Sequence, residues 1–104
     1  MPVGYVYIMS SSFKVLYLGF TTHIEQRVWQ HKNGFYEGSF TSRYKIDKLV
    51  YYEQYSLVIK AISREKELKG WRRDRKIALI VSKNPDWKDL SAAWGKPIKL
   101  LNAD

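Results

Sequence analysis

The sequence predicts an α+β domain in which a small three-stranded antiparallel β-sheet is flanked by helices. The chain has 104 residues, a length that suits one domain with one hydrophobic core. Hydrophobic residues make up 45% of it, as in globular proteins. Its β-prone and helical segments follow one another in the order ββα, β, αα, which predicts a small sheet covered by helices.

Two β-prone runs at the N-terminal end predict a hairpin. Residues 3–9 are rich in Val, Tyr and Ile, and residues 14–20 form a second apolar run. The three serines between them, residues 10–12, are a turn signal. Because a short turn between two such runs brings them side by side, we expect an antiparallel pair.

The next segment predicts a helix. Thr22 and Glu25 are spaced as a capping box, in which the two side chains satisfy backbone N–H groups at the helix start. We expect the helix to end at about Lys32, since Asn-Gly follows. Residues 35–45, with a glycine and several Ser and Thr, predict a loop.

The second half of the chain predicts one strand and two helices. Residues 47–55 carry the β-prone run Leu-Val-Tyr-Tyr. Residues 56–69 follow as a helix with a serine cap at the start and a glycine after the end. Residues 72–82 predict a further helix that Asn-Pro interrupts, and residues 86–94 predict a short helix or turn.

The composition excludes several classes of protein. The chain has no cysteine, which rules out disulfides and a cysteine-ligated zinc and favours a reducing compartment. We see no signal peptide, and no apolar run approaches the ~18 residues of a membrane span. We therefore expect a cytoplasmic protein with one domain over residues 1–95 and a flexible tail over residues 96–104.

Positive charge is concentrated in one part of the chain. The net charge is +8, and more than half of it lies between residues 60 and 76. A basic patch of this kind attracts polyanions, usually DNA or RNA. Two alternatives stay open, a solvated helical face without a partner and a membrane surface, although the apolar face that a membrane needs is weak. The residues expected to contact nucleic acid are Lys66, Lys69, Arg72, Arg73, Arg75 and Lys76.

Glu65 is the clearest candidate for a metal ligand. It is four residues from Ala61 and three from Leu68, so on a helix it projects from the apolar side. A carboxylate there must be paired, protonated or bound to a metal. Mg²⁺ keeps several waters and uses few protein carboxylates, so one glutamate can be its sole protein ligand. The alternative is that the apolar stripe is rotated and Glu65 lies at its solvated margin.

Four further residues are candidates for phosphodiester cleavage, which needs a proton acceptor, a metal and a partner for phosphate charge. Arg27 is either an exposed helical cation or a ligand of the scissile phosphate. His31, one turn later, is either a surface or packing residue or a catalytic group. Tyr7 and Tyr17 lie on the hairpin strands, where tyrosine usually packs but can also relay a proton.

Aromatic residues are frequent, with four Trp and eight Tyr, and invite a base-stacking hypothesis. We expect most of them to form or cover the core, in particular Trp29, Tyr51, Trp87 and Trp94. The sequence singles out none as a stacking residue.

At these residues the chain resembles the GIY-YIG nuclease superfamily. The two signature tripeptides correspond to residues 5–7, Tyr-Val-Tyr, and 17–19, Tyr-Leu-Gly. The family arginine falls on Arg27, the His or Tyr one turn later on His31, and the metal-binding glutamate on Glu65.

The resemblance runs from about residue 3 to residue 68. It is to the small single-domain bacterial members and to the N-terminal catalytic domain of the excinuclease branch. Tyr5 stands where the first tripeptide has glycine, and Phe20 where the excinuclease branch has a basic residue.

The resemblance implies a metal-dependent endonuclease acting on DNA, in DNA repair or recombination. Glu65 would hold one Mg²⁺, with Mn²⁺ as the alternative ion, and Arg27 would bind the phosphate oxygens. Tyr17 or Tyr7 would take the proton from the attacking water, with His31 assisting or replacing it. DNA would be the partner, with RNA still open, and the protein would be a monomer or a weak homodimer with no membrane contact. Two rivals stay open, a non-catalytic nucleic-acid-binding module and a protein-interaction adaptor.

Overall fold

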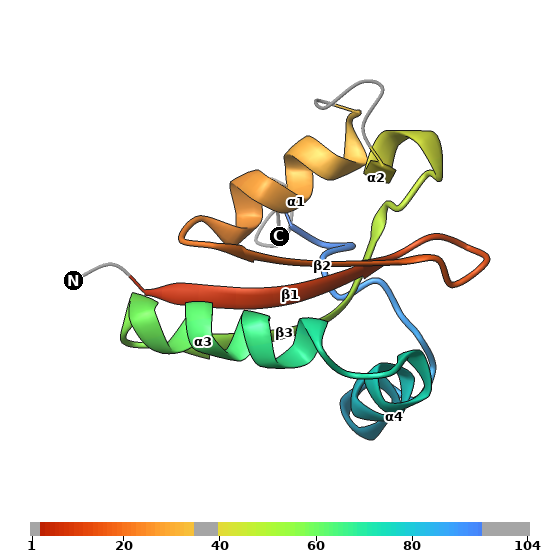
Figure 1. Ribbon diagram of the computed structural model, residues 1–104. Helices are drawn as coiled ribbons and strands as arrows, with labels where there is room; N and C mark the ends of the chain where they lie inside the picture. The colour runs from red at the N-terminus through yellow and green to blue at the C-terminus, as the bar shows by residue number, and fades with distance from the viewer. Residues whose placement is uncertain (1–2, 35–39, 95–104) are drawn as a thin grey trace, which may run out of the picture.

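A three-stranded antiparallel sheet separates two layers of helices in the computed structural model, which describes residues 3–34 and 40–94 (Figure 1). The strand order is β2-β1-β3, so the first strand is the central one. The predicted α+β class is therefore confirmed. The elements are, in chain order, β1 (Gly4–Ser10), β2 (Leu16–Thr21), α1 (Ile24–Lys32), α2 (Phe40–Arg43), β3 (Lys48–Tyr55), α3 (Val58–Lys69) and α4 (Arg73–Lys83).

The central strand β1 is buried on both faces because helices cover both sides of the sheet. Val6 and Ile8 belong to the core beneath α3 and α4, whereas Tyr7 and Met9 belong to the core beneath α1. This division follows from the alternation of side chains along a strand. All four side chains are fully buried, which explains the nearly continuous apolar run in this part of the sequence.

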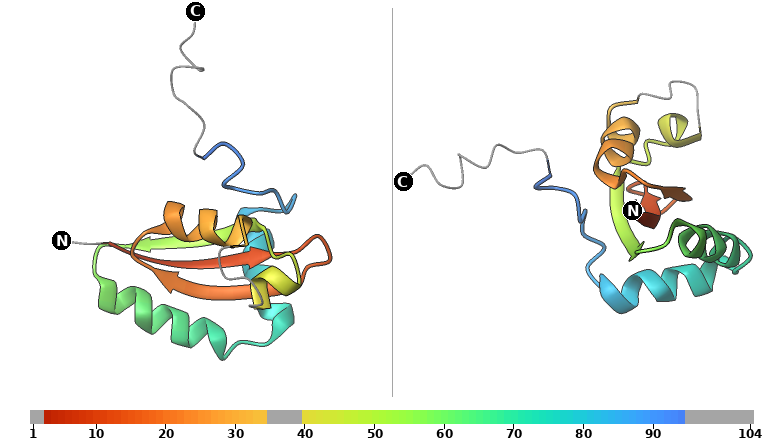
Figure 2. Two further views of the ribbon diagram at one scale, coloured as in Figure 1. Left: turned by 90° about the horizontal axis from the view of Figure 1, so that it is seen from above. Right: turned by 90° about the vertical axis from the view of Figure 1, so that its left-hand side faces the viewer.

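The two faces of the sheet carry separate cores. Figure 2 shows α1 on one side of the sheet and α3 and α4 on the other. On the α1 side, Ile24 and Val28 pack against the sheet at the i, i+4 spacing of one helical face. On the opposite side, Ala61 and Leu68 of α3 and Ile80 of α4 are fully buried.

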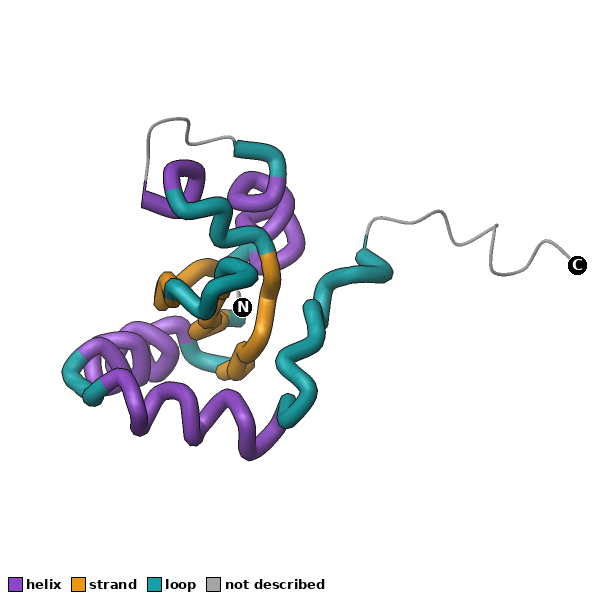
Figure 3. Tube along the Cα trace, turned by 90° about the vertical axis from the view of Figure 1, so that its right-hand side faces the viewer, coloured by secondary structure: helices purple, strands orange, loops and turns teal. Residues whose placement is uncertain are grey.

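The chain after α4 passes along the edge strand β3 and connects the two helical layers (Figure 3). The Asn84 side-chain amide donates to the carbonyl of Val50 at 3.0 Å, and the Asp89 carboxylate accepts from the backbone N–H of Leu49 at 3.1 Å. Asp89 also pairs with Lys32 of α1 at 2.6 Å. This segment therefore satisfies backbone groups of an edge strand that would otherwise be open to pairing with another chain.

The predicted strands and long helices are confirmed, and the differences lie at element ends and in the connections. α2 lies inside the segment expected to be a loop, and residues 86–94 form turns, one of the two forms expected. Residues 35–39 and the predicted tail, residues 96–104, lie outside the described residues. Among the described helices, none is long and apolar enough to cross a membrane.

Both side-chain caps predicted from the sequence are wrong. His23, not Thr22, precedes the first helical residue, and its side chain makes no capping hydrogen bond. The backbone N–H of His23 donates instead to Oγ1 of Thr21 at 3.0 Å, while the hydroxyl of Thr22 lies 2.9 Å from the His23 ring. α3 begins after Leu57, which also makes no side-chain cap, so Ser56 does not cap this helix.

Candidate active site

Three ring side chains meet on the α1 face of the sheet. The hydroxyl oxygen of Tyr7 lies 3.0 Å from Nε2 of His31, and both residues are buried. The Tyr17 ring centroid lies 5.1 Å from that of His31 and 6.2 Å from that of Tyr7. These three predicted site residues therefore form one group, which we call the phenol–imidazole cluster (Tyr7, Tyr17 and His31).

Strand pairing and helical spacing explain how the cluster forms. Tyr7 of β1 pairs with Gly19 of β2, two residues beyond Tyr17 on the same face of the strand. The two phenols are therefore diagonal neighbours on one face of the sheet. His31 comes three residues after Val28, so it shares the buried face of α1 and points toward the same part of the sheet.

Gly19 leaves the space that the two phenols occupy. A Cβ atom at this position would lie 2.7 Å from the Tyr7 hydroxyl oxygen and 3.1 Å from Cε2 of Tyr17. The first of these distances is too short for a carbon atom, so the backbone of β2 must approach the phenols without a side chain. The glycine of the second tripeptide is thus required by packing.

We expect Gly19→Ala to displace Tyr7 and to lower the free energy of unfolding by about 1–3 kcal/mol, the usual cost of overpacking a buried site. Denaturant unfolding measures this change. The control is Gly70→Ala at the end of α3, where the added Cβ would lie 3.4 Å from the Glu67 carbonyl oxygen and the glycine φ is −80°. A Gly19→Ala protein as stable as the Gly70→Ala protein would contradict this packing of Tyr7.

His31 is neutral in the folded protein at pH 7. Its pKa is lowered from 6.5 to about 4, first by burial and second by the positive charge of Arg27. A neutral imidazole has one N–H donor and one acceptor nitrogen. Nε2 faces the Tyr7 hydroxyl, and Nδ1 lies 3.1 Å from Oγ1 of Thr41, so hydroxyl groups flank both ring nitrogens. The ring is therefore oriented and offers one nitrogen as a hydrogen-bond acceptor.

Thr41 belongs to the candidate site through its contact with His31, and the sequence did not predict this. It lies on α2, inside the segment predicted to be a loop, and its side chain is buried. No helical or strand spacing connects it with His31, ten positions earlier. The one signal was indirect, because a buried histidine needs polar partners for its ring nitrogens.

Arg27 lies on α1 next to a hollow of about 380 Å³ at the junction of β2 and α1. Phe20, Thr22 and Gln30 line this hollow together with Arg27. The arginine is half-buried, and its charge acts on His31, so it lies beside the phenol–imidazole cluster. A guanidinium has five N–H donors in a fork that matches phosphate oxygens. Arg27 thus has the chemistry and the position to bind a phosphate near His31.

Glu65 lies on α3, whose core is on the opposite face of the sheet from the phenol–imidazole cluster. The buried stripe of α3 runs between Arg64 and Glu65. Arg64 reaches Glu53 of β3 at 3.0 Å. Because successive helical residues are about 100° apart, Glu65 lies on the other margin of this stripe from Arg64, and α3 also packs against the edge strand β2 that carries Tyr17. Its side chain is 19% exposed, and Nζ of Lys69 lies 3.3 Å from its Oε2.

The donor set around Glu65 limits the metals that it suits. Across residues 3–34 and 40–94, no three His, Asp or Glu side chains gather closely enough to hold a metal ion together. Zn²⁺ takes three or four protein ligands and does not fit a lone carboxylate. Mg²⁺ keeps several waters and binds through one or two carboxylates, so it fits the partly exposed Glu65.

The predicted nucleic-acid contacts lie at the end of α3 and the start of α4. Arg72 is near Asp74 at 3.8 Å, and the Arg75 guanidinium lies 3.9 Å from the Trp71 ring centroid. Two further members, Arg73 and Lys76, line a hollow beside the hairpin loop. Binding of nucleic acid by this group stays a prediction. All six residues are at least partly exposed: Lys66, Lys69, Arg72, Arg73, Arg75 and Lys76.

The prediction that four aromatic residues form or cover the core is confirmed for three of them. Tyr51 is buried, and Trp87 and Trp94 each pack against one of the two cores. Trp29 is different, because its side chain on α1 is 59% exposed. It lies outside the buried stripe of this helix.

Known proteins are similar to this chain in sequence and in fold. The family model described as the GIY-YIG catalytic domain matches residues 3–78. A UPF0213 protein of Syntrophus aciditrophicus is 36% identical over 86 residues, which cover 83% of this chain and 98% of the relative. A UPF0213 protein of Haloquadratum walsbyi is 40% identical over 73 residues, which cover 69% of this chain and 80% of that relative. The solution NMR structure of the UPF0213 protein BH0048 from Bacillus halodurans has the same fold, with a TM-score of 0.55 at 23% identity over 91% of this chain and 99% of that one.

The chain therefore belongs to the GIY-YIG catalytic domain family, a family of nucleases. Its similarity to UPF0213 proteins extends over almost the full length of the Syntrophus relative. The family predicted from two tripeptides, an arginine, a histidine and a glutamate is confirmed.

Proposed function

We propose that the protein is a metal-dependent endonuclease that hydrolyses phosphodiester bonds in DNA, in the setting of DNA repair or recombination. The single observation that carries this proposal is the phenol–imidazole cluster beside Arg27, with a neutral His31 at its centre. Such a cluster provides a proton acceptor next to a cation that suits phosphate. Membership of a nuclease family supports the same conclusion.

In the proposed reaction, Arg27 binds the non-bridging oxygens of the scissile phosphate and offsets the charge that grows on them. A phenol, of Tyr17 or Tyr7, accepts the proton of the attacking water, and His31 assists by accepting the proton of Tyr7 through Nε2. This assistance requires the tautomer in which Nδ1 carries the hydrogen and donates it to Thr41. Thr41 is then a positioning residue for His31.

Glu65 is the residue proposed to hold Mg²⁺, with Mn²⁺ as the alternative. When bound, such an ion acts as a Lewis acid on the phosphate and stabilises the leaving oxygen. α3 packs against the edge strand β2, which carries Tyr17 on its other face, so a site that includes Glu65 would extend around the edge of the sheet. Six basic residues at the end of α3 and the start of α4 would hold the DNA backbone without reading bases: Lys66, Lys69, Arg72, Arg73, Arg75 and Lys76.

Two rival functions make different predictions. A non-catalytic nucleic-acid-binding module would bind DNA in a salt-dependent manner and cut nothing with any metal. A protein-interaction adaptor would form a stable complex that survives nuclease treatment. Neither role requires a buried neutral histidine beside two phenols and an arginine, and this arrangement favours the endonuclease.

The test is incubation of the pure protein with supercoiled, single-stranded and branched DNA, and with RNA, in Mg²⁺, in Mn²⁺ and in EDTA. We expect cleavage of DNA with either metal and none in EDTA. Arg27→Ala should cut about 10²–10³-fold more slowly, the usual loss when one donor to a transition-state oxyanion is removed. Equal cutting by the wild type and Arg27→Ala would indicate a contaminating nuclease or a different site, and no cutting of any substrate would favour the binding module.

A further inference from the structure

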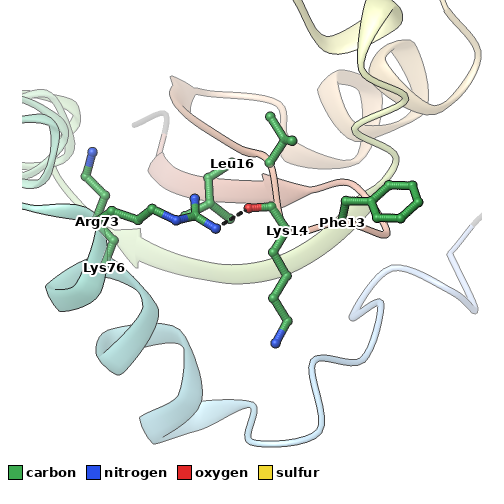
Figure 4. Close-up of a pocket in the computed structure, with 6 residues that line it drawn as sticks. Phe13, Lys14, Leu16, Arg73 and Lys76 are labelled. Carbon is green, nitrogen blue, oxygen red and sulfur yellow. Dashed lines mark hydrogen bonds between the residues drawn. The ribbon is translucent and has the colours of Figure 1, made fainter.

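The loop of the β1–β2 hairpin and the start of α4 line a second hollow, of about 360 Å³, which is open to solvent. Figure 4 shows the Arg73 side chain extending from α4 to the loop, while the Phe13 ring lies at the other end of the loop and turns away from α4. We call this hollow the hairpin cleft. It is lined by Phe13, Lys14, Val15, Leu16, Arg73 and Lys76.

The hairpin loop is held in one conformation by its own hydrogen bonds. The Ser11 hydroxyl accepts from the backbone N–H groups of Phe13 at 3.1 Å and Val15 at 3.0 Å. Arg73 donates from Nη2 to the Lys14 carbonyl at 2.7 Å, which fastens the loop to α4. Lys14 itself has φ of 62°, a left-handed conformation that non-glycine residues adopt rarely and only where surrounding contacts enforce it.

The hydrogen-bonded hairpin loop exposes an aromatic ring to solvent. The Phe13 side chain is 91% exposed. A single exposed apolar residue is common on protein surfaces and is not informative alone. Phe13 differs because it belongs to a hydrogen-bonded loop whose other end contacts the cationic side chain of Arg73.

The hairpin cleft has a positive charge. Lys14, Arg73 and Lys76 contribute three cations, and none of its six lining residues is acidic. Arg73 uses one of its five N–H donors on the Lys14 carbonyl, so further donors can bind an anion. Proteins bind unpaired nucleotides by combining exposed rings, on which bases stack, with cations that contact the phosphates, and the hairpin cleft offers both kinds of group along one loop.

We propose that the hairpin cleft binds a single-stranded DNA segment adjoining the scissile phosphate, with a base stacked on Phe13 and the backbone on Arg73 and Lys76. The inference rests on the proposed endonuclease function and names its substrate class, duplex DNA that carries a single-stranded tail. Leu16 lines the hairpin cleft and immediately precedes Tyr17 on the edge strand β2. A DNA strand that leaves the phenol–imidazole cluster can therefore continue into the hairpin cleft. A base inside a duplex has no free face for Phe13, so a blunt duplex cannot use the ring.

The test measures binding in EDTA, where no metal-dependent cutting occurs, by fluorescence anisotropy with a labelled blunt duplex and the same duplex carrying a single-stranded tail. The wild type should bind the tailed duplex more tightly. Phe13→Ala should weaken binding of the tailed duplex about fivefold or more and leave the blunt duplex unchanged. Phe13→Trp should restore tail binding. Lys76→Ala should weaken binding and lower the magnitude of the salt slope by about 1.

Two control variants separate this cleft from general surface effects. Ile59→Ala removes another exposed apolar side chain, on α3, and Lys83→Ala removes a cation at the far end of α4. Both should bind like the wild type. The inference is overturned if Phe13→Ala binds both DNAs as the wild type does, or if Lys83→Ala weakens binding as much as Lys76→Ala.

The two proposals fail in different ways. Loss of tail binding in Phe13→Ala by a protein that cuts no DNA would support the cleft and reject the endonuclease. Metal-dependent cutting by a protein whose Phe13→Ala variant binds tails normally would reject the cleft and keep the endonuclease.

Discussion

Replacement of Glu65 by Gln is expected to abolish metal-dependent DNA cleavage and to leave the fold in place. Glutamine keeps the size of the side chain but removes the negative charge that holds Mg²⁺. Lewis-acid stabilisation is worth several kcal/mol, so we expect a loss of about 10³-fold or more in cleavage rate. The surface pair with Lys69, whose side chain is 56% exposed, contributes ~1 kcal/mol at most to stability.

Cleavage rates of Glu65→Gln in Mg²⁺ and in Mn²⁺ measure the effect, and Mn²⁺ titration followed by electron paramagnetic resonance measures metal binding directly. The matched control is Glu67→Gln, on the same helix, where the carboxylate is 56% exposed and pairs with Arg64. Glu67→Gln should bind Mn²⁺ and cut as the wild type does. A Glu65→Gln protein that keeps both properties would remove Glu65 from the site.

The strands and long helices could be predicted because their signals are local and repeated. The N-terminal run of Val, Tyr and Ile identifies β1, although only the structure shows that the run is continuous because both faces are buried. α3 was predicted from apolar residues at helical spacing, and Ala61 and Leu68 are fully buried as that pattern requires. These predictions depend on residues that are neighbours in sequence.

Helix caps depend on competition between neighbouring hydroxyl groups, and they were less predictable than the strands and helices. The hydroxyls of Thr21 and Thr22 both lie near the start of α1, and the pattern alone favoured Thr22 as the cap. In the structure Thr21, at the end of β2, takes the His23 N–H, and Thr22 contacts the His23 ring. One residue of displacement in a strand end is enough to change which hydroxyl is used.

The arrangement of the candidate site residues was predictable from the sequence only in part. The spacing of Arg27 and His31 places them on one edge of α1, and the hairpin places Tyr7 and Tyr17 on one face of the sheet. The spacing on α3 gives the face from which Glu65 projects but not the side of the sheet on which that helix packs. Since α3 covers the other face, the proposed site must extend around β2, which as an edge strand leaves this path unobstructed by a further strand.

The second large expected effect is a pH dependence of the free energy of unfolding that comes from His31. Well above pH 6.5 the ring is neutral in both the folded and the unfolded protein, so it adds no pH dependence there. Between pH 6.5 and about 4 the unfolded chain takes up a proton that the folded protein resists, because the folded-state pKa is about 4. The free energy of unfolding should therefore fall as the pH falls through this window, by on the order of 3 kcal/mol from this group. Denaturant unfolding at several pH values measures the slope.

His31→Gln removes the titrating ring and should flatten this part of the pH–stability curve. Because general acid–base assistance contributes about 10²–10⁴-fold, its cleavage rate should fall by a factor in that range at pH 7. His23→Gln is the matched control, since it removes the second of the two histidines of the chain from an exposed position at the start of α1. An equal slope in wild type and His31→Gln would contradict a buried, neutral His31.

The same histidine also tests the link to Arg27. The arginine charge is one of the two causes that lower the His31 pKa, so Arg27→Gln should raise that pKa toward its ordinary value, while burial keeps it below 6.5. Titration of the His31 ring by NMR measures this shift without any cleavage assay. An unchanged His31 pKa in Arg27→Gln would show that the charge of Arg27 does not act on His31. A phosphate bound by Arg27 would then not be expected to interact with the proton acceptor at His31.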